Sequence, residues 1–185
     1  MPAAGEGCMS FFVELRRRNV VRVGIAYAIA AWIIGKTEAG LMQGLDGVEL
    51  QLGLGYLPAQ FLSPRTNIRV DEWNGDVGRW RFIDEVVETV RATIGPELAL
   101  IARISADEKV RGGLGITHAL SLGHRIASQG VDAVHVVTGS ACDSPAWYYQ
   151  HMSLPAGINE KLAERVKERL EMPVVVAGRL GDPQR

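Results

Sequence analysis

Apolar residues recur along the chain in two alternating patterns, short continuous runs and longer stretches with helical spacing. Short apolar runs are typical of the buried strands of a parallel sheet. Apolar residues three or four positions apart are typical of a helix that packs along one face. The predicted strands are 48–52, 98–104, 132–137 and 173–177, and the predicted helices are 76–93, 117–128 and 159–170. Strands that alternate with helices in this way predict a parallel α/β fold.

The segment between the first predicted strand and the first predicted helix is long and rich in turn-forming residues. Gly53 and Gly55 let the backbone approach a neighbouring group closely, and Pro64 and Asn67 are typical of turns. A loop of this length inside a compact domain usually has a functional role. The sequence therefore predicts a long, ordered and functional loop.

This segment and the strand before it carry an ordered series of short motifs. The series runs Gly47-Val48-Glu49-Leu50, Gly55-Tyr56-Leu57, Gln60-Phe61-Leu62-Ser63-Pro64, Thr66-Asn67 and Asp71-Glu72-Trp73. It resembles the fourth barrel strand and following loop of the flavin oxidoreductases in the old yellow enzyme and 2,4-dienoyl-CoA reductase family. The resemblance continues through 101–108, 130–139 and 173–183, and it covers about 39 to 184.

The resemblance implies an α/β fold whose four parallel strands are the fourth to the seventh of a TIM barrel. On this interpretation 39–185 form a partial, half barrel of an FMN-dependent oxidoreductase, and 1–38 form a separate N-terminal hydrophobic helix. A closed barrel needs about 200 residues or more, so we interpret the sequence as a truncated form. The outer strands would leave open edges at 47–51 and 173–178, which is an aggregation hazard.

The N-terminal segment has the charge order of a membrane anchor. Arg16, Arg17, Arg18 and Arg22 precede an uncharged run from Val23 to Gly35, as expected when basic residues stay on the cytoplasmic side. Spanning a bilayer takes about 20 apolar residues, so the run is short. The alternative is a helix that packs against the sheet in the position of the barrel's third helix.

The family resemblance implies an NADH:flavin oxidoreductase that binds FMN and takes electrons from NADH or NADPH. Its substrate would be a small molecule with an activated carbon–carbon double bond, and its location would be cytoplasmic. A companion chain or a second copy would complete the barrel, and the chain alone is expected to bind FMN weakly or not at all. The alternative function is a non-catalytic, membrane-tethered half barrel that does not retain flavin.

The resemblance assigns FMN binding to three residues. Arg103 corresponds to an arginine beside the flavin pyrimidine ring, where a guanidinium stabilises negative charge; the alternative is an ion pair with Asp107 or Glu108. Gly178 and Arg179 correspond to half of the FMN phosphate site, since glycine permits close backbone approach and arginine binds phosphate with a planar fork.

Two further residues are assigned to catalysis and to the substrate. Tyr56 corresponds to the tyrosine that donates a proton to the substrate carbon, which a phenol can do because it is a weak acid; the alternative is an aromatic side chain that bonds the loop backbone. Arg65 corresponds to an arginine that some reductases use near the substrate, and a solvated loop arginine is the alternative.

Several positions depart from the family pattern. Gln51 and Leu54 stand where many members carry two histidines, or a histidine and an asparagine, that bind the substrate oxygen, and leucine cannot donate a hydrogen bond. Cys142 stands where relatives carry a histidine. These departures argue against a typical enone reductase and favour the dienoyl-CoA reductase branch. The segment 147–149, which contains one tryptophan and two tyrosines, is expected to pack over the barrel mouth.

Composition and charge exclude several other classes. With a net charge of −1 over 185 residues, the chain lacks the basic excess of proteins that bind nucleic acids. The two cysteines have neither metal-ligand spacing nor the pattern of a disulfide framework, which indicates a reducing compartment and no metal site. The histidines at 118, 124 and 135 have no evident carboxylate partners and are interpreted as structural.

Overall fold

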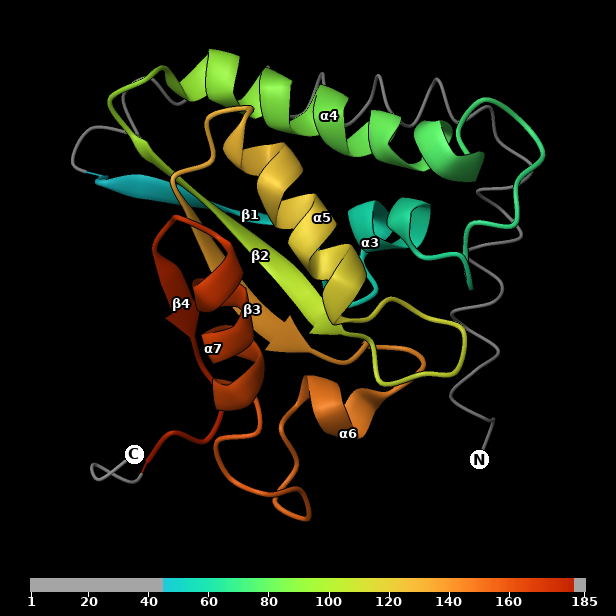
Figure 1. The fold of residues 1–185 in the computed structure, drawn as a ribbon, viewed down its shortest axis with the longest axis vertical. Helices are drawn as coiled ribbons and strands as arrows, with labels where there is room; N and C mark the ends of the chain where they lie inside the picture. The colour runs from blue at the N-terminus through green and yellow to red at the C-terminus, as the bar shows by residue number, and fades with distance from the viewer. Residues whose placement is uncertain (1–44, 182–185) are drawn as a thin grey trace.

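The structure is a computed structural model that describes residues 45–181, so the predicted N-terminal helix over 1–38 lies outside the described residues. The described elements, numbered as in Figure 1, are β1 (Gly47–Gln51), α3 (Leu57–Leu62), α4 (Gly75–Ile94), β2 (Ala99–Asp107), α5 (Ile116–Ala127), β3 (Ala133–Thr138), α6 (Pro145–Tyr148), α7 (Glu160–Arg169) and β4 (Val174–Val176). The predicted alternation of strands and helices is confirmed.

The four strands form one parallel sheet in chain order, β1-β2-β3-β4. Each strand pairs with the next in the sequence, and the helices α4, α5 and α7 cover one face of the sheet (Figure 1). Within residues 45–181, β1 and β4 each pair on one side only, as expected for open edges. This arrangement is that of consecutive βα units of a TIM barrel.

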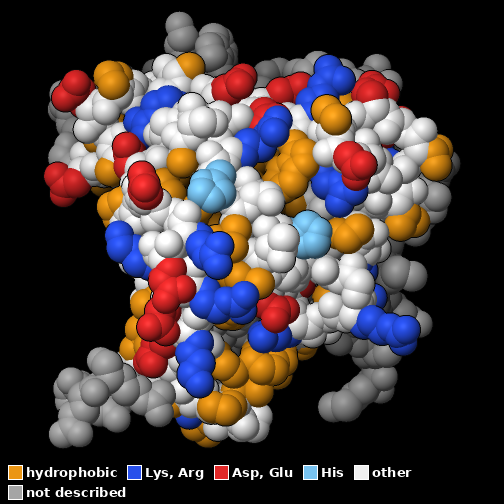
Figure 2. Space-filling view, viewed as in Figure 1, with side chains coloured by type: hydrophobic (Ala, Val, Ile, Leu, Met, Phe, Trp, Pro, Cys, Tyr) orange, Lys and Arg blue, Asp and Glu red, His pale blue; other side chains and the backbone are white. Residues whose placement is uncertain are grey.

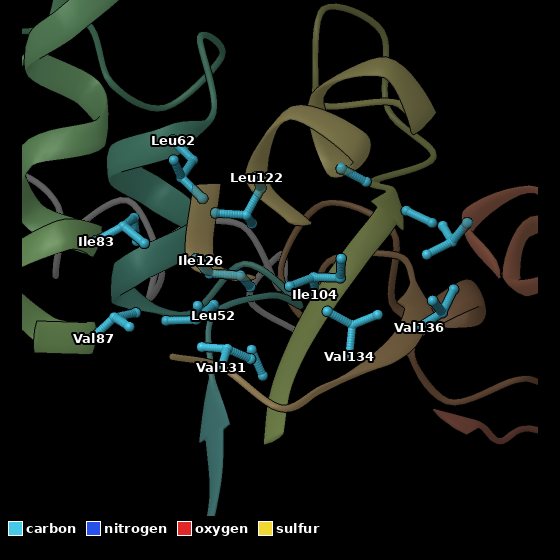
Figure 3. Packing of buried hydrophobic residues seen from close by; sticks show 14 of the residues in the cluster. Leu52, Leu62, Ile83, Val87, Ile104, Leu122, Ile126, Val131, Val134 and Val136 are labelled. Atoms are coloured by element: carbon cyan, nitrogen blue, oxygen red, sulfur yellow. The ribbon is translucent and has the colours of Figure 1, made fainter. Parts of the chain in front are cut away.

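The core lies between the sheet and these helices. Leu100, Ala102 and Ile104 alternate along β2 and are fully buried, because successive side chains of a strand point to opposite faces. They meet helix side chains that include Ile83 and Ile126 (Figure 3). Burying one such aliphatic side chain contributes about 1.5 to 3 kcal/mol, so this face holds the helices in place.

The predicted helix ends are close to the observed ones. Helix α4 ends where predicted, with Gly95 in the left-handed region at a φ of 75° and its N–H bonded to the carbonyl of Arg91. Thr117, the first position of the next predicted helix, would be its N-cap, but the structure places Gly115 at the N-cap of α5 and no side chain caps this helix. The boundary therefore lies two residues earlier, where glycine takes an extended conformation.

The predicted long loop is wrong in part, because it contains helix α3. Pro58 lies in the first turn of this helix, where its missing N–H and fixed φ are tolerated. The rest of the segment is held by buried Asn67, whose amide nitrogen donates to the carbonyls of Phe61 at 2.7 Å and Trp73 at 2.8 Å. The aromatic rings of these two residues pack edge to face, so the segment is ordered.

The helical face carries acidic and basic side chains intermixed, as the near-neutral net charge predicts (Figure 2).

Among residues 45–181, no helix combines the length and the apolar character that crossing a bilayer requires.

Candidate functional site

Polar side chains gather on the face of the sheet opposite the helices. Along β2, Arg103 and Ser105 alternate with the core residues and so point to this second face. The parallel register places Gln51, Arg103 and His135 at paired positions on three neighbouring strands. The fold therefore builds a row of polar groups across the inner face of the half barrel.

An ion pair fixes Arg103 on this face. Its Nη2 lies 2.5 Å from Oε1 of Glu49, so the partner of Arg103 is Glu49 on the neighbouring strand rather than Asp107 or Glu108. The other carboxylate oxygen of Glu49 lies 2.7 Å from Nδ1 of His135. The side chain of Arg103 remains 32% exposed, so its guanidinium is held in place and still accessible.

His135 completes this cluster. Its Nδ1 also lies 3.3 Å from Nε of Arg103, but one nitrogen cannot donate to Glu49 and accept from Arg103 at once. The shorter contact fits a proton on Nδ1 that the carboxylate of Glu49 accepts. Nε2 is buried and has no hydrogen-bond partner among the described residues. The interpretation of this histidine as lacking a carboxylate partner is wrong.

A tight turn presents Tyr56 at the end of β1. Leu54 and Gly55 both take left-handed conformations, with φ of 61° and 77°. The N–H of Leu54 donates to Oγ of Ser105 at 2.7 Å, and a Cβ at Gly53 would come within 2.7 Å of the backbone nitrogen of Ser105. The turn is thus tied to β2 at a point where only glycine fits.

The phenol of Tyr56 is half exposed and bonds another phenol. Its hydroxyl lies 3.0 Å from the hydroxyl of Tyr148 in α6, and the residue is 45% exposed. The alternative in which Tyr56 bonds the loop backbone does not describe this geometry. The hydrogen bond with Tyr56, together with burial, raises the pKa of Tyr148, and the charge of Arg103 opposes that shift. Tyr56 and Arg103 therefore both act on Tyr148.

Arg65 borders a small hollow beside this turn. Its Nη2 bonds Oδ1 of Asp143 at 2.8 Å, and its side chain is 43% exposed. The hollow is lined by Gly55, Gln60, Ser63, Arg65, Thr66, Glu108, Ser140, Cys142 and Asp143. Arg65 is therefore an ion-paired arginine beside a polar hollow, rather than a free solvated one.

Glu108 is a buried carboxyl that joins three loops. Its Oε2 accepts from Oγ of Ser63 and from the N–H of Leu114, each at 2.7 Å. Its backbone carbonyl accepts from Oγ of Ser144 at 2.6 Å. Burial raises the pKa of Glu108, and the hydrogen bonds from Leu114 and Ser63 only partly oppose this shift. The residue thus links the segments that carry Arg65 and Tyr148.

We expect Glu108→Gln to change the pH dependence of stability. Because the pKa of Glu108 is raised in the folded state, its contribution is fully present below the ordinary carboxyl pKa and is lost as the pH rises through the raised pKa. Glutamine keeps an acceptor oxygen and does not ionise. The free energy of unfolding of the variant should therefore rise relative to wild type as the pH increases above about 4, the ordinary carboxyl pKa, as measured by urea denaturation. A constant difference across this range would contradict the prediction.

Gly178 and Arg179 follow β4. Gly178 has a φ of 114°, which favours glycine. The guanidinium of Arg179 donates through Nη1 to the carbonyl of His151 at 3.0 Å and to that of Leu154. A phosphate contact through this side chain would compete with these two carbonyls.

The structure brings some of the predicted residues together. The hydroxyl of Tyr56 bonds that of Tyr148, the charge of Arg103 acts on Tyr148, and Arg65 shares a hollow with Gly55 of the same turn. Gly178 and Arg179 stand against the segment after α6, since the side chain of Gln150 is the nearest neighbour of Gly178. The sequence-based assignment missed Glu49, His135 and Tyr148. The alternation of polar residues along the strands could have indicated the first two.

No cluster of histidine, cysteine, aspartate or glutamate suited to a metal ion occurs within residues 45–181. Cys142 is disulfide-bonded in the structure, so the expectation of a chain without disulfides is wrong for this residue.

Sequence comparison relates the chain to flavin enzymes. A sequence profile of the NADH:flavin oxidoreductase / NADH oxidase family matches residues 29–185. A metal reductase of Desulforamulus reducens is 30% identical over 177 residues, which cover 92% of this chain and 25% of that protein. An NADPH dehydrogenase of Clostridium acetobutylicum is 33% identical over 171 residues, which cover 91% of this chain and 47% of that protein. The chain thus spans between a quarter and about half of the length of these relatives.

Solved structures share the same fold. A complex of 2-naphthoyl-CoA reductase with 2-naphthoyl-CoA superposes with a TM-score of 0.75 at 26% identity, covering 89% of this chain and 24% of that chain. Morphinone reductase, at 23% identity and a TM-score of 0.58, is similar in fold.

Proposed function

Because this chain belongs to the NADH:flavin oxidoreductase / NADH oxidase family, we propose that it forms the catalytic half of an FMN-dependent oxidoreductase. The electron donor is NADH or NADPH, and the acceptor is a small molecule with an activated carbon–carbon double bond. The enzyme is similar to dienoyl-CoA reductases, and this chain corresponds to part of their barrel. The observation that carries the proposal is the hydrogen bond between the hydroxyls of Tyr56 and Tyr148, a pair of weak acids close enough to Arg103 for its charge to act on Tyr148.

The residues of the inner face fit a flavin. Arg103 presents a guanidinium that is held by Glu49 and is still a third exposed, and the buried Nε2 of His135 is a polar atom with no partner among residues 45–181. Gly178 provides the backbone conformation that close approach to a phosphate requires. When bound, FMN supplies the hydride chemistry.

The residues of this chain bind the cofactor, protonate the substrate and hold it in place. Arg103 stabilises negative charge on the pyrimidine end of the cofactor, and Gly178 and Arg179 bind the phosphate. Tyr56 donates a proton to the substrate carbon next to the one that receives hydride. Arg65 binds the substrate from the polar hollow beside the turn, where it is oriented by Asp143.

The family resemblance supports a cytoplasmic location. The open edges of β1 and β4 within the described residues support completion of the barrel by a companion chain or by a second copy. Because the chain alone is expected to bind FMN weakly, the test is made on the chain purified together with the copy or companion chain that completes its barrel. A flavin absorbance spectrum that stays with the protein through purification supports the proposed function. A colourless protein that needs detergent to stay in solution would favour a non-catalytic, membrane-tethered module.

We expect Arg103→Ala to weaken FMN binding by about 2 to 4 kcal/mol, or about 30-fold to 1000-fold, because a preorganised charge contact is lost. The dissociation constant is measured by titrating FMN and following its fluorescence. Arg103→Gln separates the loss of charge from the loss of hydrogen bonds, and Arg179→Ala should weaken binding without changing the flavin potential. Arg165→Ala, on the exposed side of α7, is the matched control. Equal affinities for Arg103→Ala and wild type would rule out the proposed role.

A further inference from the structure

Helix α6 places a second phenol, that of Tyr148, beside Tyr56, the proposed proton donor. The hydroxyls of Tyr56 and Tyr148 lie 3.0 Å apart although the two residues are 92 positions apart in the sequence. Their rings meet edge to face, with centroids 6.5 Å apart. At this distance the two oxygens share one hydrogen bond, and either hydroxyl can donate it while both are neutral.

The short helix is held firmly enough to keep this contact. Oγ of Ser144 donates to the carbonyl of Glu108 at 2.6 Å and accepts from the N–H of Ser140 at 2.8 Å. Gly139 has a φ of 88°, and a Cβ there would come within 2.5 Å of the backbone nitrogen of Tyr148. Glycine at this position therefore permits the approach of α6 to the carboxyl ends of β2 and β3 (Figure 1).

The electrostatic surroundings determine which phenol keeps its proton. The hydrogen bond with Tyr56 and burial both raise the pKa of Tyr148. A hydroxyl that retains its proton is the donor when its partner becomes an anion. The positive charge of Arg103 opposes this rise without reversing it, so Tyr148 is the phenol that keeps its proton.

We propose that Tyr148 is a positioning residue that donates a hydrogen bond to the Tyr56 oxygen as that oxygen loses its proton to the substrate. This role rests on the proposed function. As hydride adds to one alkene carbon, the O–H bond of Tyr56 breaks and a C–H bond forms at the neighbouring carbon. The electron pair of the broken bond stays on the Tyr56 oxygen, which Tyr148 stabilises until water returns a proton.

The test is a double-mutant cycle on alkene reduction by the FMN-loaded chain. Tyr148→Phe should slow the reoxidation of reduced flavin by an activated alkene about tenfold to a hundredfold, since hydrogen bonds to charged groups are the stronger ones. Flavin reduction by NADPH should not change. In a Tyr56→Phe background, Tyr148→Phe should have no further effect, because the hydrogen bond has no phenolate to stabilise. An equal slowing in both backgrounds would show that Tyr148 only supports the fold, and would overturn the proposal.

Tyr149→Phe is the matched control. Tyr149 adjoins Tyr148, is 74% exposed and contacts its ring edge to face with centroids 4.6 Å apart. Removing its hydroxyl should change the alkene rate by no more than about twofold. A loss as large as that of Tyr148→Phe would contradict a specific role for the Tyr148 hydroxyl.

A measurement without flavin separates this proposal from the proposed function. NMR titration of labelled tyrosines should show a raised pKa for Tyr148 that falls in Tyr56→Phe. No change would mean that the pair does not form, and would overturn the proposal even in an active enzyme. If the pair forms but the flavin-loaded chain reduces no alkene, the proposed function fails and the role of Tyr148 in it fails as well.

Discussion

Tyr56→Phe is expected to slow the reoxidation of reduced flavin by an activated alkene by a factor of about 10² to 10⁴, the usual contribution of a positioned acid. Phenylalanine keeps the ring at the end of β1 and removes only the proton and the bond to Tyr148. FMN binding and flavin reduction by NADPH should stay as in wild type, because neither step takes a proton from Tyr56. Stopped-flow absorbance of the flavin measures the two half-reactions separately.

The same experiment shows whether the family role applies to this site. Loss of FMN binding in Tyr56→Phe would mean that the phenol supports the cofactor or the fold. An unchanged alkene rate would mean that the proton comes from another group. Tyr149→Phe removes a hydroxyl from an exposed tyrosine nearby and controls for the general effect of such a change.

Ile104→Ala is expected to lower the free energy of unfolding by about 2 to 5 kcal/mol, since the lost transfer energy adds to that of the cavity left behind. Ile104 is fully buried in the middle of β2, between the sheet and the helices. Denaturation by urea, followed by circular dichroism, measures the change. The loss is a large fraction of the stability of an ordinary domain.

Val77→Ala is the matched control for the core. Val77 lies near the start of α4 and is 80% exposed, so truncating it should change the free energy of unfolding by no more than about 0.5 kcal/mol. A loss for Ile104→Ala similar to that of the control would mean that the interface between sheet and helices does not carry the stability of the fold.

The order of strands and helices could be predicted from the sequence because buried elements show a clear pattern of apolar residues. The apolar runs around Leu100 and Val134 can only be buried between covering layers, and the helical stripes of α4, α5 and α7 supply the cover. Helix α3 was missed because Gly53, Gly55 and Pro64 are typical of loops, and the short run between them has few positions for a periodic pattern.

The sequence predicted the residues of the site only where they lie in a recognisable motif. Tyr56 and Arg103 lie in ordered motifs, whereas Tyr148 lies in a short helix 92 positions from its partner. Glu49 and His135 meet only because three strands are in register, and register is a property of the folded sheet. Contacts of this kind join residues that no local pattern connects.

The order of the strands in the sheet also affects how the chain folds. Gly47 pairs with Ala99, Ile101 with Ala133, and Val134 with Val174, so each new strand joins the one made just before it. The entropy lost in closing a loop rises only slowly, by about 0.6 kcal/mol for each doubling of its length. Successive units can therefore assemble one after another as the chain leaves the ribosome, each using the previous strand as its template.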